Sequence, residues 1–169
     1  YRCPLKMTYP DCGVACANDV KELINTTTTG KVAGILAEPI QGVGGFITPP
    51  DAYFNIVADI IHEHGGIFIS DEVQTGFGRT GKTWGIQHSG VEPDMITVAK
   101  GIANGMPLAA VVTTKDIADT LQKNTISTFG GNPVSSAAAN ATLEIIERDE
   151  LKANANEMGE IFKDGLIKI

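Results

Sequence analysis

Two residues with chemically useful side chains each follow a short apolar run. The run at 67–70 ends at Asp71, and the run at 95–99 ends at Lys100, which a glycine follows. Runs of this kind are typical of buried parallel strands, and α/β folds bind their ligands at the carboxyl ends of such strands. We therefore expect the carboxylate of Asp71 and the amine of Lys100 to meet over one small molecule.

This pair of groups suits a heteroaromatic aldehyde. A carboxylate can hold a ring nitrogen protonated, and a partly neutral lysine amine can form a Schiff base with an aldehyde. Pyridoxal phosphate (PLP) requires both groups. The spacing alone also fits a simpler interpretation, in which Asp71 caps a helix and Lys100 lies on the surface.

The other apolar runs predict an α/β arrangement around these two residues. A strand at 32–37, a helix beginning near Asp51 and a strand at 67–71 form a right-handed βαβ unit. A strand at 108–113 follows the one at 95–99 after a link too short for a crossover helix, so these two should run antiparallel. The sequence thus predicts a mostly parallel sheet with one antiparallel strand and flanking helices.

Four further helices are expected, at 18–24, 115–122, 133–148 and from about 149 to the chain end. Asn18 and Asn132 would cap the first and third of these, because asparagine accepts hydrogen bonds from the free N–H groups of a first turn. Pro133 suits a first helical position. The lead-in up to residue 18 should be coil, and the polar run at 25–29 a surface loop.

Composition excludes several classes of function. A net charge of −7 with dispersed basic residues argues against nucleic-acid binding, and no apolar run approaches the roughly 20 residues that span a bilayer. Cys3, Cys12 and Cys16 lack partners that would complete a tetrahedral metal site, so free thiols are expected. His62 and His64 point to different helix faces, so no metal is expected there either.

Four motifs resemble those of class-III (subgroup II, ω-type) PLP-dependent aminotransferases in the same order and spacing. They lie at 37–42 (AEPIQG), 70–81 (SDEVQTGFGRTG), 93–101 (PD with AKG) and 128–133 (TFGGNP). The resemblance covers roughly residues 32–148 and implies the fold type I of PLP-dependent transferases. Residues 1–31 would be a lead-in, and 32–169 the latter part of the PLP-binding large domain.

The resemblance implies roles for four residues around the cofactor. Asp71 would pair with the pyridine nitrogen, and Lys100 would hold the aldehyde as a Schiff base and move a proton during the reaction. Val73 would pack against one face of the ring, and Gln74 would lie near the phenolic oxygen. On sequence alone, Val73 also suits a generic core position, and Gln74 a backbone hydrogen bond.

Two more residues are assigned by the same resemblance. Thr128 would reach the phosphate of the partner subunit's cofactor, which implies a homodimer or tetramer with shared active sites. Glu38 matches a glutamate that pairs with an arginine in several members and gates substrate binding. The alternatives are a simple turn position for Thr128 and no gating role for Glu38.

The implied activity is a ping-pong, Schiff-base transamination. An amino acid or amine such as alanine would donate to a 2-oxo acid such as glyoxylate or pyruvate. Tracts at 9–13, 26–30 and 37–39 look most like mitochondrial-type alanine–glyoxylate aminotransferases. Acetylornithine, ornithine and 4-aminobutyrate aminotransferases share the core motifs, as do mutase and decarboxylase relatives. A catalytically silent α/β binding module is a further alternative, and the compartment is expected to be mitochondrial or cytoplasmic.

The chain also departs from the family's pattern. The family's N-terminal phosphate-binding turn, its stacking aromatic and its C-terminal small domain have no counterpart in these 169 residues. The arginines present, Arg2, Arg79 and Arg148, have no obvious carboxylate-binding context. We therefore expect the isolated chain to bind PLP weakly and not to transaminate.

Overall fold

The computed structural model describes residues 3–169. The helices are α1 (Ala15–Thr27), α2 (Tyr53–Glu63), α3 (Lys115–Ala118), α4 (Pro133–Arg148) and α5 (Leu151–Ile167). The strands are β1 (Gly34–Ala37), β2 (Ile67–Asp71), β3 (Met95–Val98) and β4 (Ala110–Thr113), and two short 3-10 helices are η1 (Gly85–His88) and η2 (Lys100–Ala103).

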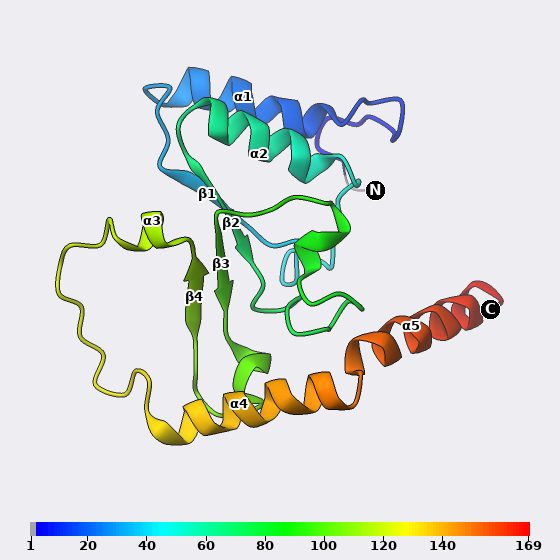
Figure 1. Ribbon diagram of the computed structural model, residues 1–169. Helices are drawn as coiled ribbons and strands as arrows, with labels where there is room; N and C mark the ends of the chain where they lie inside the picture. Colours follow the sequence, from blue (N-terminus) through cyan, green and yellow to red (C-terminus); the bar gives the residue numbers. More distant parts are fainter. Residues whose placement is uncertain (1–2) are drawn as a thin grey trace.

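The four strands form one sheet in the order β1-β2-β3-β4 (Figure 1). β1, β2 and β3 are parallel, and β4 runs antiparallel to β3. In this register Ala37 lies beside Ser70, and Asp71 beside Thr97. The predicted sheet, with one antiparallel strand after a short link, is therefore confirmed.

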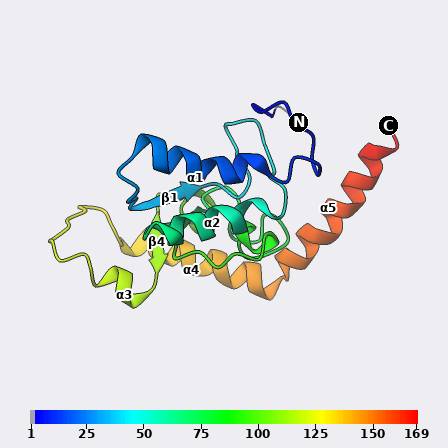
Figure 2. The same cartoon turned by 90° about the horizontal axis from the view of Figure 1, so that it is seen from above.

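The main core lies between the sheet and helices α1 and α2, which lie side by side (Figures 1 and 2). Apolar residues recur on one face of α2, as expected of a helix that covers a sheet. Phe54, Val57 and Ile61 are buried on that face, and Phe68 of β2 is fully buried beneath it. The rings of Phe54 and Phe68 meet edge to face at 5.9 Å.

A second, smaller core lies where α4 packs against η2. It contains Val98, Ile102, Ala103 and Ala139, and its small side chains allow the two helices to approach closely. Asn132 caps α4 as predicted, since its Oδ1 accepts the backbone N–H of Ser135 at 3.0 Å, and a proline occupies the first turn. The packing of α4 against η2 places α4 next to the segment that begins at residue 100.

Helix α1 differs from the prediction. It begins after Val14, so Asn18 lies inside the helix and does not cap it. It also runs past residue 24 to Thr27, because the hydroxyls of Thr26 and Thr27 donate to carbonyls four residues earlier, at 2.7 and 2.6 Å. Part of the expected loop at 25–29 is therefore helical.

The three cysteines are free thiols, and residues 1 and 2 of the expected coil lie outside the described residues.

Other boundaries also move. β1 begins at Gly34 and not at residue 32, because its pairing with β2 begins there, opposite Ile67. β4 begins at Ala110 and not at residue 108, because its pairing with β3 ends opposite Val98. α3 ends at Ala118, four residues before the predicted end. α5 begins after Glu150, whose left-handed backbone (φ 50°) separates it from α4.

The outer elements leave apolar side chains exposed. Val111 and Val112 of β4 are both more than half exposed, and no residue of α5 is buried. α5 extends away from the sheet in both views (Figures 1 and 2), with Phe162 and Ile167 among its exposed residues. None of the helices between residues 3 and 169 has the length and apolar character that crossing a membrane requires.

Asp94 links α2 to the starts of β2 and β3. Its Oδ2 lies 2.8 Å from His62 Nε2 and accepts the backbone N–H of Phe68 at 2.7 Å. Partial burial acts to raise the pKa of Asp94, but the hydrogen bonds from His62 and Phe68 together act more strongly and lower it below its ordinary value. The ionised form is therefore favoured in the folded state.

This shift predicts a pH dependence of stability. Because the folded-state pKa is lowered, the contribution of Asp94 is present above about pH 4 and is lost as the pH falls through the folded value. Asp94→Asn should be less stable than wild type near pH 6, and the gap should close below about pH 4. Urea unfolding across this range measures the gap, and a constant gap would contradict the assignment.

Candidate functional site

A pocket of about 310 Å³ opens beside the carboxyl ends of the parallel strands. Its wall comes from the three segments that follow β1, β2 and β3, because parallel strands bring these ends to one edge of the sheet. The residues that line it are Ile40, Gly42, Phe46, Val73, Gln74, Thr75, Gly76, Phe77, Arg79, Thr80, Lys100 and Gly101.

Lys100 reaches this pocket from the end of β3. Its Nζ donates a hydrogen bond to Gln74 Oε1 at 2.7 Å, so the two predicted residues do meet. The backbone of Lys100 is left-handed (φ 44°), a conformation that costs a non-glycine residue roughly 1–2 kcal/mol. Strain of this kind collects at functional sites, where the surrounding structure imposes it.

Asp71 is the last residue of β2 and is half-buried. Its Oδ1 accepts the backbone N–H of Val73 at 3.1 Å, which turns the chain so that Val73 lines the pocket. Asp71 itself does not line the pocket. Its strand, β2, pairs directly with β3, which leads to Lys100. The predicted meeting of the Asp71 carboxylate and the Lys100 amine over one small molecule stays a prediction.

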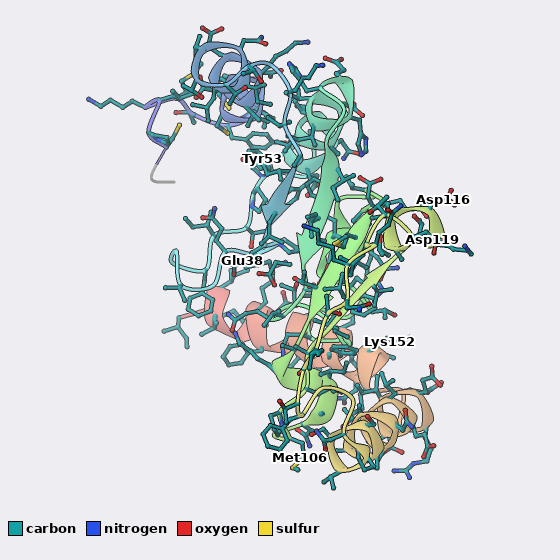
Figure 3. All side chains as sticks on the ribbon, turned by 90° about the vertical axis from the view of Figure 1, so that its left-hand side faces the viewer. Glu38, Tyr53, Met106, Asp116, Asp119 and Lys152 are labelled. Atoms are coloured by element: carbon teal, nitrogen blue, oxygen red, sulfur yellow. The ribbon has the colours of Figure 1, made fainter. Side chains whose placement is uncertain are left out.

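Glu38, labelled in Figure 3, follows β1 and orders the loop that lies beside Gln74. Its Oε2 accepts the backbone N–H of Gly42 at 2.8 Å. A Cβ atom on Gly42 would lie 2.3 Å from Gln74 Nε2, so the absence of a side chain there leaves room for the Gln74 amide. Glu38 therefore acts on the pocket through the loop.

Thr128 is not brought to this pocket. It lies exposed in the loop between α3 and α4, and it is absent from the lining. Arg79, in contrast, lines the pocket, although no carboxylate-binding context was evident for it in the sequence. The available signal in the sequence was its position between Gly78 and Gly81, and both glycines adopt positive φ in the structure.

The segment that carries Arg79 packs against the start of α5. Lys152, labelled in Figure 3, donates to Thr83 Oγ1 at 3.3 Å, and a Cβ on Gly78 would lie 2.9 Å from Lys152 Cγ. Phe77 and Trp84 meet edge to face at 5.2 Å on the inner side of this segment. The pocket wall is thus supported from both sides.

Sequence reasoning did not single out Glu72, which is fully buried next to the site. Its carboxylate accepts four hydrogen bonds, two at each oxygen: Ser70 Oγ and the N–H of Ile86 at Oε1, and Thr75 Oγ1 and the N–H of Gly85 at Oε2. A buried carboxylate needs such a complete set of donors. A glutamate directly after a buried strand was the only signal in the sequence.

Comparison with known proteins bears on the nature of this site. The chain is 44% identical to alanine–glyoxylate aminotransferase 2 homolog 2, mitochondrial, of Arabidopsis thaliana, over 98% of this chain and 35% of that protein. It is 44% identical to the human mitochondrial alanine–glyoxylate aminotransferase 2, over 89% of this chain and 30% of that protein. It is 43% identical to the leucine/methionine racemase of Thermococcus litoralis, over 94% of this chain and 36% of that protein. The chain therefore spans about a third of the length of these relatives.

Solved structures agree with the sequence comparison. A Bacillus anthracis aminotransferase matches with a TM-score of 0.87 and 35% identity, over 92% of this chain and 36% of that chain. The ornithine aminotransferase of Toxoplasma gondii, described with partial occupancy of PLP at its active site, matches with a TM-score of 0.83 and 32% identity, over 90% and 35%. Residues 2–169 match the family described as aminotransferase class-III. With this match along nearly its whole length, the chain belongs to the class-III aminotransferase family.

Proposed function

We propose that the intact protein uses PLP to move an amino group from an amino acid to a 2-oxo acid, with alanine and glyoxylate or pyruvate as the substrate pair. The observation that carries this proposal is the Lys100 amine at the edge of the pocket, 2.7 Å from Gln74 and one strand from Asp71. The pocket, the strand order and the family membership all support a cofactor that needs these groups.

The residues present fit PLP. Lys100 offers a primary amine for an aldehyde, and Asp71 offers a carboxylate at the neighbouring strand end for a ring nitrogen. Val73, Ile40 and Phe46 give apolar wall for a flat ring. Among residues 3–169, no acidic side chain lines the pocket, which suits a phosphate-bearing group.

Each residue would then have a defined task. PLP, when bound, supplies an aldehyde that condenses with amines and a ring that withdraws electrons. The Lys100 Nζ would hold the aldehyde and, when free, would carry a proton at that nitrogen during the reaction. Asp71 would hold a proton on the ring nitrogen. Val73 would support the ring face, and Gln74 would orient the groups around the phenolic oxygen.

Two residues would act at the borders of the site. Thr128 is exposed and outside its own chain's pocket, which is consistent with a contact to the phosphate in a partner subunit and hence with a homodimer or tetramer. Glu38 would gate substrate binding, and its bond to Gly42 places it one contact away from Gln74. Two of the relatives are named mitochondrial enzymes, which supports the mitochondrial alternative for the compartment.

The test is a direct assay of the intact protein with PLP. Alanine and glyoxylate should yield pyruvate and glycine, with neither product formed when one substrate is left out. The racemase among the relatives favours racemisation as the second candidate function. A racemase would interconvert the enantiomers of an amino acid without any 2-oxo acid, and that result would replace transamination as the function.

Gly42→Ala should weaken PLP binding in the intact protein. The new Cβ would meet Gln74 Nε2 at 2.3 Å and displace the amide that would orient the phenolic oxygen of PLP. Loss of one hydrogen bond to the cofactor, worth about 1 kcal/mol, predicts about fivefold weaker binding in a PLP titration. Gly44→Ala is the control. It lies in the same loop, but its new Cβ would lie 3.2 Å from the nearest atom, Gln41 Oε1. Equal affinity of both variants would contradict the role of Gln74.

The isolated chain 1–169 should bind PLP weakly and show no turnover. The apolar faces of β4 and α5 are exposed in it, and Thr128 lies away from its own pocket. Purified chain, assayed with alanine, glyoxylate and PLP at saturating levels, checks this. Measurable turnover by this chain alone would show that its residues suffice for the reaction.

A further inference from the structure

The buried carboxylate of Glu72 is placed where the pocket wall is attached to the sheet. The residue has no exposed surface, yet it immediately follows β2 and precedes the lining residues Val73 and Gln74. None of the tasks proposed above uses it. Burying an ionisable side chain costs free energy of desolvation, even when it has a complete set of hydrogen-bond partners. This cost raises the question of what Glu72 contributes to the structure in return.

The four donors to Glu72 come from different parts of the chain. Ser70 belongs to β2, and its hydroxyl donates at 3.1 Å. Thr75 belongs to the start of the pocket wall and donates at 2.5 Å. Gly85 and Ile86 open the 3-10 helix after the wall, and their N–H groups donate at 2.8 and 2.9 Å. The carboxylate therefore fastens both ends of the segment 75–86 to the strand that carries Asp71.

The backbone at Gly76 and Gly85 packs closely around Glu72. A Cβ atom on Gly85 would lie 2.6 Å from Thr75 Cβ, so only a glycine allows the two ends of the segment to meet at Glu72. The N–H of Gly76 also donates to the Glu72 carbonyl at 2.9 Å. Between these fixed ends lie Phe77, Arg79 and Thr80, which line the same pocket as Lys100.

We propose that Glu72 is a positioning residue: it fixes the segment 75–86 against the end of β2 and so holds the pocket wall at the spacing that PLP requires. The effect on PLP rests on the function proposed above, whereas the anchoring of the segment does not. Glu72 touches neither Lys100 nor the pocket, so it acts only through the residues it holds.

Glu72→Gln is the sharpest variant, because it keeps the shape and removes one acceptor. Each carboxylate oxygen receives one backbone N–H, so the new NH2 group faces a donor in either orientation. Glu92→Gln makes the same chemical change at an exposed site and is the control. Ser70→Ala removes a single donor without touching the pocket and serves if Glu72→Gln folds poorly.

Two measurements on the intact protein, well below the melting temperature of each variant, test the proposal. The rate of limited trypsin digestion without PLP measures how often the segment 75–86 opens, since Arg79 and Lys82 lie within it and are exposed. Glu72→Gln should be cut after these two residues about tenfold faster than wild type, because proteolysis follows the population of the open segment. A PLP titration should show binding weakened by about tenfold, as for other residues that support a binding site.

Cleavage confined to Arg79 and Lys82 together with weaker PLP binding, and no change in Glu92→Gln, is the expected result. Ser70→Ala should show a smaller change of the same kind. Unchanged cleavage, cleavage raised equally throughout the chain, or unchanged PLP affinity in the face of faster local cleavage would each overturn the positioning role. If wild type itself binds no PLP, the proposed function fails, and local cleavage alone decides whether Glu72 anchors the segment.

Discussion

Replacing Lys100 by alanine is expected to lower transamination by the intact protein by at least about 10⁴-fold, because one amine both binds the cofactor aldehyde and carries the proton. No other lysine lines the pocket among the described residues, so none is placed to substitute. The measurement is the rate of pyruvate formation from alanine and glyoxylate under single-turnover and steady-state conditions.

Two controls separate the amine from its charge. Lys100→Arg keeps a positive charge near Gln74 but has no primary amine, so it should be as inactive as the alanine variant. Lys31→Ala removes an exposed lysine before β1 and should leave the rate unchanged. Activity within tenfold of wild type in Lys100→Ala would remove the residue from the reaction.

Phe68→Ala should be the most damaging single change to stability. Phe68 is fully buried in β2, between the sheet and α2, and its ring meets that of Phe54. Its truncation removes buried apolar surface and leaves a cavity, which typically costs about 3–5 kcal/mol. Because β2 carries Asp71, cofactor binding should weaken as well.

Phe68→Leu is the matched control, because it fills most of the space and should cost less than about 1.5 kcal/mol. Chemical unfolding of the intact protein gives both values. If both variants lose the same free energy of unfolding, the core around residue 68 relaxes around the change, and the packing of the Phe68 ring has little importance.

Much of the fold could be predicted because its signals are local. The apolar runs before Asp71 and Lys100 marked β2 and β3, and the short link after Lys100 required the antiparallel β4. Asn132 with Pro133 gave the start of α4 correctly. Such signals act within a few residues, so one sequence carries them in full.

The errors arose where local signals compete. Four consecutive threonines predicted a loop, yet the hydroxyls of Thr26 and Thr27 bond back to the helix and extend α1. Asn18 was a plausible cap in type, but the helix had already begun three residues earlier. Competition of this kind depends on packing, which the sequence alone does not display.

The structure brings together some of the residues singled out from the sequence, but the residues that support them were not predicted. Lys100 contacts Gln74, and Asp71 lies at the adjoining strand end but outside the pocket lining. Glu72 and Arg79 were missed, because their importance comes from contacts made across the fold, such as the bonds from Gly85 and Ile86. The proximity of these groups is a property of the folded chain.

The most direct test of the central claim is to find the lysine that holds the cofactor. The intact protein is incubated with PLP, reduced with borohydride to make the bond permanent, digested and analysed by mass spectrometry. The account predicts that the peptide carrying Lys100 gains the mass of a reduced pyridoxyl phosphate group, and that Lys100→Ala gains none at any comparable yield. A label on another lysine, or no label in wild type, would contradict it.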